Sequence, residues 1–208
     1  SIVVHKIVHH LTDRIVGWGY ADIKLRDIYR YNLENRISAA IAFVIIMITG
    51  ILFHKFMYAI IFLIGFTTLN GATGGYHAPT LLKCLLLSDA TFAITLFVSI
   101  SLSSIENIVV TLSIQIVGIA FAIIVVFIKA PYNHPNLDLD TTEIQYLKKK
   151  SRKIIISISL ISVLMILSKF PIGITSMIIL TMDAIGISLL IAKIKRGGQH
   201  NYEKETGK

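Results

Sequence analysis

Long apolar stretches are the feature that most limits what this chain can fold into. Residues 108–128 and 172–192 are each long enough to cross about 30 Å of hydrocarbon as a helix. Only helices and closed barrels satisfy their backbone groups in that layer, and no stretch alternates as barrel strands do. With 54% hydrophobic and 15% charged residues, the chain is too apolar for an ordinary soluble domain. We therefore expect an all-α integral membrane protein.

Shorter or interrupted apolar stretches predict four further spans. Residues 85–103 form one, and residues 154–168 form another between a basic cluster and a lysine. The apolar block 37–69 is interrupted by His54 and Lys55, which predicts two spans joined by a tight turn. The sequence therefore predicts a polytopic membrane protein with about six transmembrane helices.

The distribution of lysine and arginine predicts the orientation in the membrane. Residues 1–36 and 129–153 hold six each and residues 193–208 hold five, whereas the turns on the opposite side hold two. Because basic residues gather on the cytoplasmic side, both termini and the basic loop 129–153 are predicted to be cytoplasmic. The segment 70–89, between the second and third spans, is predicted on the same side. The net charge of +8 is then explained without a nucleic-acid partner.

The N-terminal segment 1–36 predicts an amphipathic helix ahead of the membrane domain 37–192 and the tail 193–208. Apolar residues recur there at spacings of three and four, which places them on one helical face. These residues are Val4, Val8, Leu11, Ile15 and Trp18. Such a face either lies in the headgroup region or packs against the spans. The frequent charges in this segment are not expected of a secretory signal peptide.

Residues 70–89 interrupt the apolar pattern with the sequence NGATGGYHAPTLLKCLLLSD. Three glycines before His77 disfavour a regular helix, and Pro79 suits the first turn of a new one. The glycines are Gly71, Gly74 and Gly75. We expect a re-entrant or cytoplasmic loop that carries His77, and then a helix from about residue 79 that carries Cys84. Irregular backbone at membrane depth requires surrounding protein or a water-filled cavity, so we expect a cavity open to the cytoplasm.

His77 and Cys84, the only cysteine, are a candidate catalytic pair. On one continuous helix they would lie about 10 Å apart along the axis, so a folded-back loop is needed to bring them together. An imidazole removes the proton of a thiol or pairs with the thiolate, which activates cysteine for acyl transfer. The alternative is that Cys84 packs inertly among leucines and that His77 caps a helix or lies at the membrane interface. The spacing alone favours this alternative. A single cysteine excludes an internal disulfide and a CxxC site.

Two motifs together resemble those of a known family. The stretch GGYHAPTLLKC, residues 74–84, resembles the signature of the accessory gene regulator B (AgrB) family, bacterial membrane endopeptidases that process autoinducing-peptide precursors. The stretch KAPYNHPN, residues 129–136, resembles the second motif of that family, and the basic LKKKSRK follows it. Size, span count and motif positions agree over essentially the whole chain. The chain departs from the family at Asn70, where members often carry an arginine, and Lys83 is a candidate substitute.

The resemblance implies a cysteine endopeptidase of the bacterial plasma membrane with its active site on the cytoplasmic side. Cys84, assisted by His77, would attack a peptide bond of a short AgrD-like precursor, release a charged C-terminal fragment and form an acyl-enzyme. A cysteine or serine of the precursor would then displace Cys84 and close a thiolactone or lactone ring, a quorum-sensing signal. Water must be excluded, because hydrolysis would give a linear product. The resemblance implies no cofactor and is compatible with a homodimer.

Other polar residues are candidates for supporting roles. Asp183 lies within the last span, where a charge is costly; it would orient His77, pair with a lysine or, when protonated, form a hydrogen bond to a neighbouring helix. Ser88 shares a helical face with Cys84, whereas Asp89 marks the membrane boundary. Three lysines either set the topology and contact anionic lipid or steer an acidic precursor tail. These are Lys148, Lys149 and Lys150. The histidines near the N-terminus lack a carboxylate cluster, so no metal site is predicted.

A non-enzymatic peptide permease or exporter is the alternative from another functional class. In it, His77 and Asp183 would relay protons and Cys84 would be incidental. The sequence lacks a convincing internal repeat of the kind that many transporters show. A purely structural membrane subunit would tolerate the loss of both His77 and Cys84.

Overall fold

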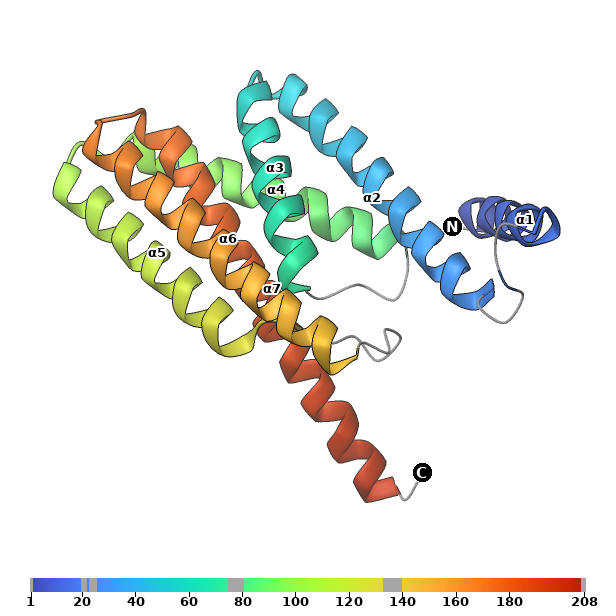
Figure 1. Ribbon diagram of the computed structural model, residues 1–208. Coiled ribbons are helices and arrows are strands. Elements are labelled where there is room, and N and C mark those ends of the chain that lie inside the picture. The colour runs from blue at the N-terminus through green and yellow to red at the C-terminus, as the bar shows by residue number, and fades with distance from the viewer. Residues whose placement is uncertain (1, 20–21, 23–25, 75–80, 133–139, 207–208) are drawn as a thin grey trace.

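The computed structural model describes residues 2–19, 22, 26–74, 81–132 and 140–206 of the chain. These residues form seven helices and no strand, which confirms the all-α prediction for the described part (Figure 1). The helices are α1 (Ile2–Gly17), α2 (Arg26–Leu52), α3 (Phe56–Thr73), α4 (Leu81–Ser103), α5 (Ile108–Lys129), α6 (Thr141–Leu167) and α7 (Ile172–Thr206).

Four helices are long and apolar enough to cross a membrane among the residues described. They are Phe56–Thr73, Leu82–Ser103, Ile108–Lys129 and Ile172–Ile194. Two further predicted spans coincide with apolar parts of helices. Arg36–Leu52 is a shorter apolar stretch within α2, and residues 154–167 follow a charged first half in α6. The membrane character is therefore confirmed, and the total of six spans stays a prediction.

The predicted tight turn between the first two spans is present. α2 ends at Leu52 and α3 begins at Phe56, with His54 in a left-handed conformation at φ 54°. The Lys55 N–H donates to the Gly50 carbonyl at 2.7 Å, which closes the turn. A side chain at Gly50 would meet the Ala59 Cβ at 2.5 Å, so the glycine allows α2 and α3 to approach closely.

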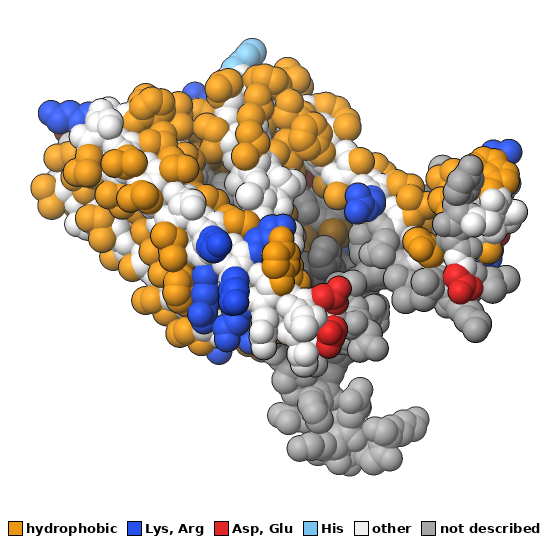
Figure 2. Space-filling view, viewed as in Figure 1, with side chains coloured by type: hydrophobic (Ala, Val, Ile, Leu, Met, Phe, Trp, Pro, Cys, Tyr) orange, Lys and Arg blue, Asp and Glu red, His pale blue; other side chains and the backbone are white. Residues whose placement is uncertain are grey.

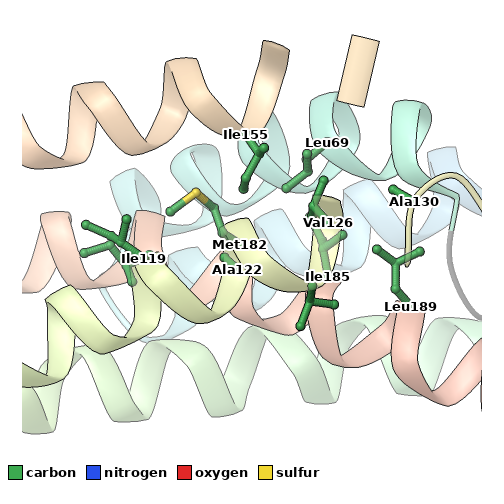
Figure 3. Close-up of a cluster of buried hydrophobic side chains, with 11 residues drawn as sticks. Leu69, Ile119, Ala122, Val126, Ala130, Ile155, Met182, Ile185 and Leu189 are labelled. Atoms are coloured by element: carbon green, nitrogen blue, oxygen red, sulfur yellow. The ribbon is translucent and has the colours of Figure 1, made fainter. Parts of the chain in front are cut away.

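Helix α7 lies at the centre of the bundle and contacts α3, α4, α5 and α6. Its buried side chains form one apolar cluster with those of α3, α5 and α6 (Figure 3). The labelled members are Leu69, Ile119, Ala122, Val126, Ala130, Ile155, Met182, Ile185 and Leu189. In lipid, helices associate through close packing and hydrogen bonds between them rather than through the hydrophobic effect. Gln115 of α5 supplies such a bond, because its Nε2 donates to the Ser176 Oγ of α7 at 2.9 Å.

A second apolar cluster joins α2, α3, α4 and α7. Phe62 of α3 is fully buried and contacts the ring of Phe92 of α4 at a centroid distance of 5.4 Å. Ile46 of α2 and Met177 of α7 complete the contact. Phe92 and Leu96 therefore anchor α4, the helix that carries Cys84, in this cluster.

Helix α1 lies beside the N-terminal half of α2 (Figure 1). Arg26 Nε donates to Asp13 Oδ1 at 2.8 Å, and His9 Nδ1 lies 3.0 Å from Asp13 Oδ2. Val8 is fully buried, whereas Leu11 is exposed and Trp18, just beyond the helix, is 64% exposed. The predicted helix is confirmed, but its apolar residues do not all pack against the protein.

Large apolar side chains cover much of the visible surface, and basic side chains gather at one end of the bundle (Figure 2). An apolar surface of this extent is typical of a protein embedded in lipid. The basic end is where α5 finishes with Lys129 and α6 begins, with Lys148, Lys149 and Lys150 exposed on α6.

Candidate functional site

Cys84 lies in the first turn of α4, which begins at Leu81. Its side chain is half-buried, so it is neither sealed in the core nor fully open to lipid. The prediction of a helix that carries Cys84 and begins near residue 79 is confirmed. Gly75, His77 and Pro79 lie outside the described residues, so the approach of His77 to Cys84 stays a prediction.

The end of α3 differs from the prediction made for the glycines. The helix continues through Gly71 to Thr73 and ends only at Gly74, where φ is 66°. One exposed glycine costs a helix about 1 kcal/mol relative to alanine. Burial of Leu69, Ala72 and Thr73 on the opposite face offsets this cost. Gly74 ends the helix because its left-handed conformation is accessible to glycine, and its N–H still donates to the Asn70 carbonyl at 2.9 Å.

The structure brings the beginnings of the two motifs into contact. The backbone N–H of Tyr132, which follows α5, donates to the carbonyl oxygen of Thr73 at 2.8 Å. A Cβ atom placed on Gly74 would lie 2.8 Å from the carbonyl oxygen of Tyr132. Residues 133–139, including the His-Pro-Asn part of the second motif, lie outside the described residues. The end of α3 and the residues just after α5 therefore meet where the two motifs begin.

Helix α4 carries two further polar residues near Cys84. Ser88 is half-buried one turn further along α4, and Lys83 is exposed beside Cys84. Asp89, interpreted from the sequence as a boundary residue, instead accepts a hydrogen bond at Oδ1 from Thr49 Oγ1 of α2 at 3.0 Å. A carboxylate within an apolar stretch was the only sequence signal for this contact. The bond ties the Cys84 helix to α2.

Asp183 lies on the α5-facing side of α7. A Cβ atom on Gly118 of α5 would lie 2.8 Å from Asp183 Oδ2, so the glycine makes room for the carboxyl group. Asp183 Oδ1 is buried and has no hydrogen-bond partner among the described residues. The carboxyl group packs against α5, and the three roles predicted for Asp183 stay predictions.

The basic cluster lies on a helix. Asp140 caps α6 in a capping box with Glu143, so residues 141–153 of the predicted basic loop are helical. The hydrogen bond from Thr142 and those from Thr141 lower the pKa of Asp140 below its ordinary value. Arg152 Nη2 donates to the Phe127 carbonyl at 3.2 Å, and its guanidinium lies 4.9 Å from the centre of the Phe127 ring. Arg152 thereby fastens α6 to the end of α5.

No group of three histidine, cysteine, aspartate or glutamate side chains suited to a metal lies together in the part of the chain that the structure describes.

A protein-family model described as accessory gene regulator B matches residues 5–191. The matched range includes both motif segments, Cys84, Asp183 and the basic cluster of α6. No curated protein and no solved structure matches the chain.

Proposed function

Because the chain belongs to the accessory gene regulator B family over residues 5–191, we propose that it is a membrane cysteine endopeptidase that matures a peptide signal. Family membership supports a role in processing an autoinducing-peptide precursor. The finer proposal is that Cys84 carries the acyl group of the precursor and that His77 moves the protons.

The position of Cys84 is the observation that carries this proposal. The only cysteine of the chain lies in the first turn of α4, half-buried. The first N–H groups of a helix have no partner within the helix, and they favour negative charge. Such groups stabilise the oxyanion that forms when a thiolate attacks a carbonyl group. A cysteine that only packs against its neighbours has no need of a position near the first N–H groups of a helix.

The reaction proceeds in two transfers. The Cys84 sulfur attacks the scissile carbonyl carbon, the C–N bond breaks, and the amine of the C-terminal fragment leaves with a proton from His77. The thiol of a precursor cysteine, or the hydroxyl of a serine, then attacks the thioester carbonyl and loses its proton to His77. The Cys84 sulfur leaves as the ring closes. One thioester replaces another in the cysteine case, so this step needs no ATP.

The precursor and the bilayer are the partners that this function requires. We place the active site at the cytoplasmic end of the bundle, where the basic residues gather and anionic lipid or an acidic peptide would be attracted. The segment that carries His77 is shaped by three residues, Gly74, Gly75 and Pro79. We propose that Ser88 and Lys83, on either side of Cys84 in α4, contact the bound precursor. A homodimer is compatible with this arrangement.

Co-expression with the short reading frame adjacent to the gene tests the proposal. Mass spectrometry should detect the released C-terminal fragment and the cyclic product with the unchanged chain. Cys84→Ala should abolish both, and His77→Ala should lower their yield by about 10²- to 10⁴-fold, the usual range for general acid–base catalysis. Ser113→Ala, on the exposed surface of α5, is the matched control and should behave as the unchanged chain. Cleavage by a membrane-inserted Cys84→Ala chain would refute the cysteine mechanism.

The permease alternative predicts a different result from the same variant. In that case Cys84→Ala would still move a supplied mature peptide across the membrane, and Asp183→Asn would stop it. The buried Asp183 Oδ1 is the one described feature that favours this alternative.

A further inference from the structure

The last turn of α3 is closed by a residue from a distant loop. Thr73 ends the helix, and its carbonyl oxygen would lack a partner within the helix. The Tyr132 N–H supplies that partner at 2.8 Å. The Thr73 side chain is fully buried, and its hydroxyl lies 3.0 Å from the Leu69 carbonyl and 2.9 Å from the Gly74 carbonyl. We call Thr73 and Gly74, together with residues 130–132, the α3–α5 junction.

Gly74 occupies a position in this junction that no side chain fits. Its φ of 66° and ψ of −175° lie in a region that is essentially restricted to glycine. An added Cβ would also lie 2.8 Å from the Tyr132 carbonyl oxygen and 3.5 Å from the Tyr132 Cβ. Gly71, three residues earlier, shows the contrast, because a Cβ there meets nothing within 4 Å.

The junction is anchored in the core. Ala130 and Leu69 belong to the same buried cluster (Figure 3). Tyr132 packs against this cluster. Arg152 of α6 donates to the Phe127 carbonyl near the end of α5, so the loop side of the junction is fixed as well. A displacement of residues 130–132 would therefore move Gly74 directly.

We propose that the α3–α5 junction positions the active-site segment, with residues 130–132 holding Gly74 and so fixing where the chain toward His77 begins. The beginning of the second motif then positions the beginning of the first, although the two lie far apart in the sequence. Three peptide units separate Gly74 from His77 and span at most about 11 Å, so few bonds are available to absorb a shift. The proposal rests on the proposed function, since it assigns a role relative to the Cys84 chemistry.

Gly74→Ala compared with Gly71→Ala tests this role. Both changes add one methyl group to the same part of the chain, but only the first meets the Tyr132 carbonyl. With co-expressed precursor, Gly74→Ala should lower kcat for cleavage on the order of 10- to 100-fold, with KM changed far less, as for a misplaced catalytic group. The pH profile of Cys84 alkylation by iodoacetamide should change as it does in His77→Ala. Gly71→Ala should match the unchanged chain in both measurements.

A second pair of variants covers the case in which Gly74→Ala does not accumulate in the membrane. Thr73→Val keeps the side-chain volume and removes the hydroxyl contact to the Gly74 carbonyl, so kcat should fall by a smaller factor. Thr67→Val is its control, because the Thr67 hydroxyl donates to the carbonyl groups of Leu63 and Ile64, which both lie within α3. Equal kcat and equal alkylation profiles for the Thr73 and Thr67 variants would contradict the proposal.

Hydrogen exchange tests the junction independently of activity. The Tyr132 N–H donates to the Thr73 carbonyl at 2.8 Å, and a Cβ atom on Gly74 would lie 2.8 Å from the Tyr132 carbonyl oxygen. In a Cys84→Ala background, Gly74→Ala should therefore speed amide exchange in the peptide that contains Tyr132, whereas Gly71→Ala should not. Equal exchange in the two variants would overturn the junction. Faster exchange together with normal kcat in Gly74→Ala would overturn its positioning role, whereas absence of Cys84-dependent cleavage in the unchanged chain would overturn the proposed function alone.

Discussion

At the scale of single residues, glycines mark where backbone or a polar group must approach closely. Gly74 ends α3 against the Tyr132 carbonyl, and Gly118 makes room for the Asp183 carboxyl group. Gly71 has no such neighbour and lies within the helix. The sequence alone predicts the same break for Gly71 and Gly74, because it contains no sign of which glycine has a neighbour. Their different roles follow from packing.

Gly118→Ala should destabilise the membrane domain at this scale. The new methyl group would lie 2.8 Å from both Asp183 Oδ2 and the Ile179 Cγ2. Overpacking of this kind costs about 1–3 kcal/mol. Unfolding by SDS titration in bicelles measures the change, with Gly71→Ala as the control. Equal unfolding midpoints for the two variants would show that α5 and α7 do not meet as described.

At the scale of elements, the length of an apolar stretch predicts a helix well. It does not predict where a helix with a polar first half begins. The helix with Cys84 and the turn at His54 follow from apolar runs and the charges between them. The first half of α6 is charged, so hydropathy assigns it to a loop, although the Asp140 capping box begins a helix there. The bond between Tyr132 and Thr73 was not predictable, because it joins two backbone groups and leaves no side-chain signal.

The lysines of α6 give a prediction for this element. Neutralising them together to glutamine should slow cleavage of a precursor with an acidic tail, and the slowing should fade as salt rises, because exposed charges are screened. These are Lys148, Lys149 and Lys150, all exposed. The control for charge alone is a chain with Lys55→Gln and Lys169→Gln. These residues lie just before α3 and just after α6, away from the basic end of the bundle. Unchanged rates with normal insertion would leave topology and lipid contact as the only roles for the α6 lysines.

At the scale of the whole molecule, the helices bring the beginnings of the two motifs together in a bundle centred on α7. The membrane class, the all-α fold and the family could be predicted from apolar runs and from two short motifs, because both are written in consecutive residues. The α3–α5 junction and the bond between Asp89 and Thr49 join residues far apart in the chain, and only the packed structure reveals them. Cys84 belongs to both groups, because the sequence reveals its motif and only the structure reveals that it is half-buried near the start of α4.

If Cys84 carries the precursor as a thioester, the mass of the Cys84 peptide after rapid acid quenching of a reacting membrane preparation should reveal it. We expect an adduct equal in mass to the N-terminal part of the precursor, removed by hydroxylamine and more abundant when the ring-closing residue of the precursor is changed to alanine. Release of the C-terminal fragment with Cys84 unmodified at every quench time, and with the same yield in Cys84→Ala, would contradict this mechanism.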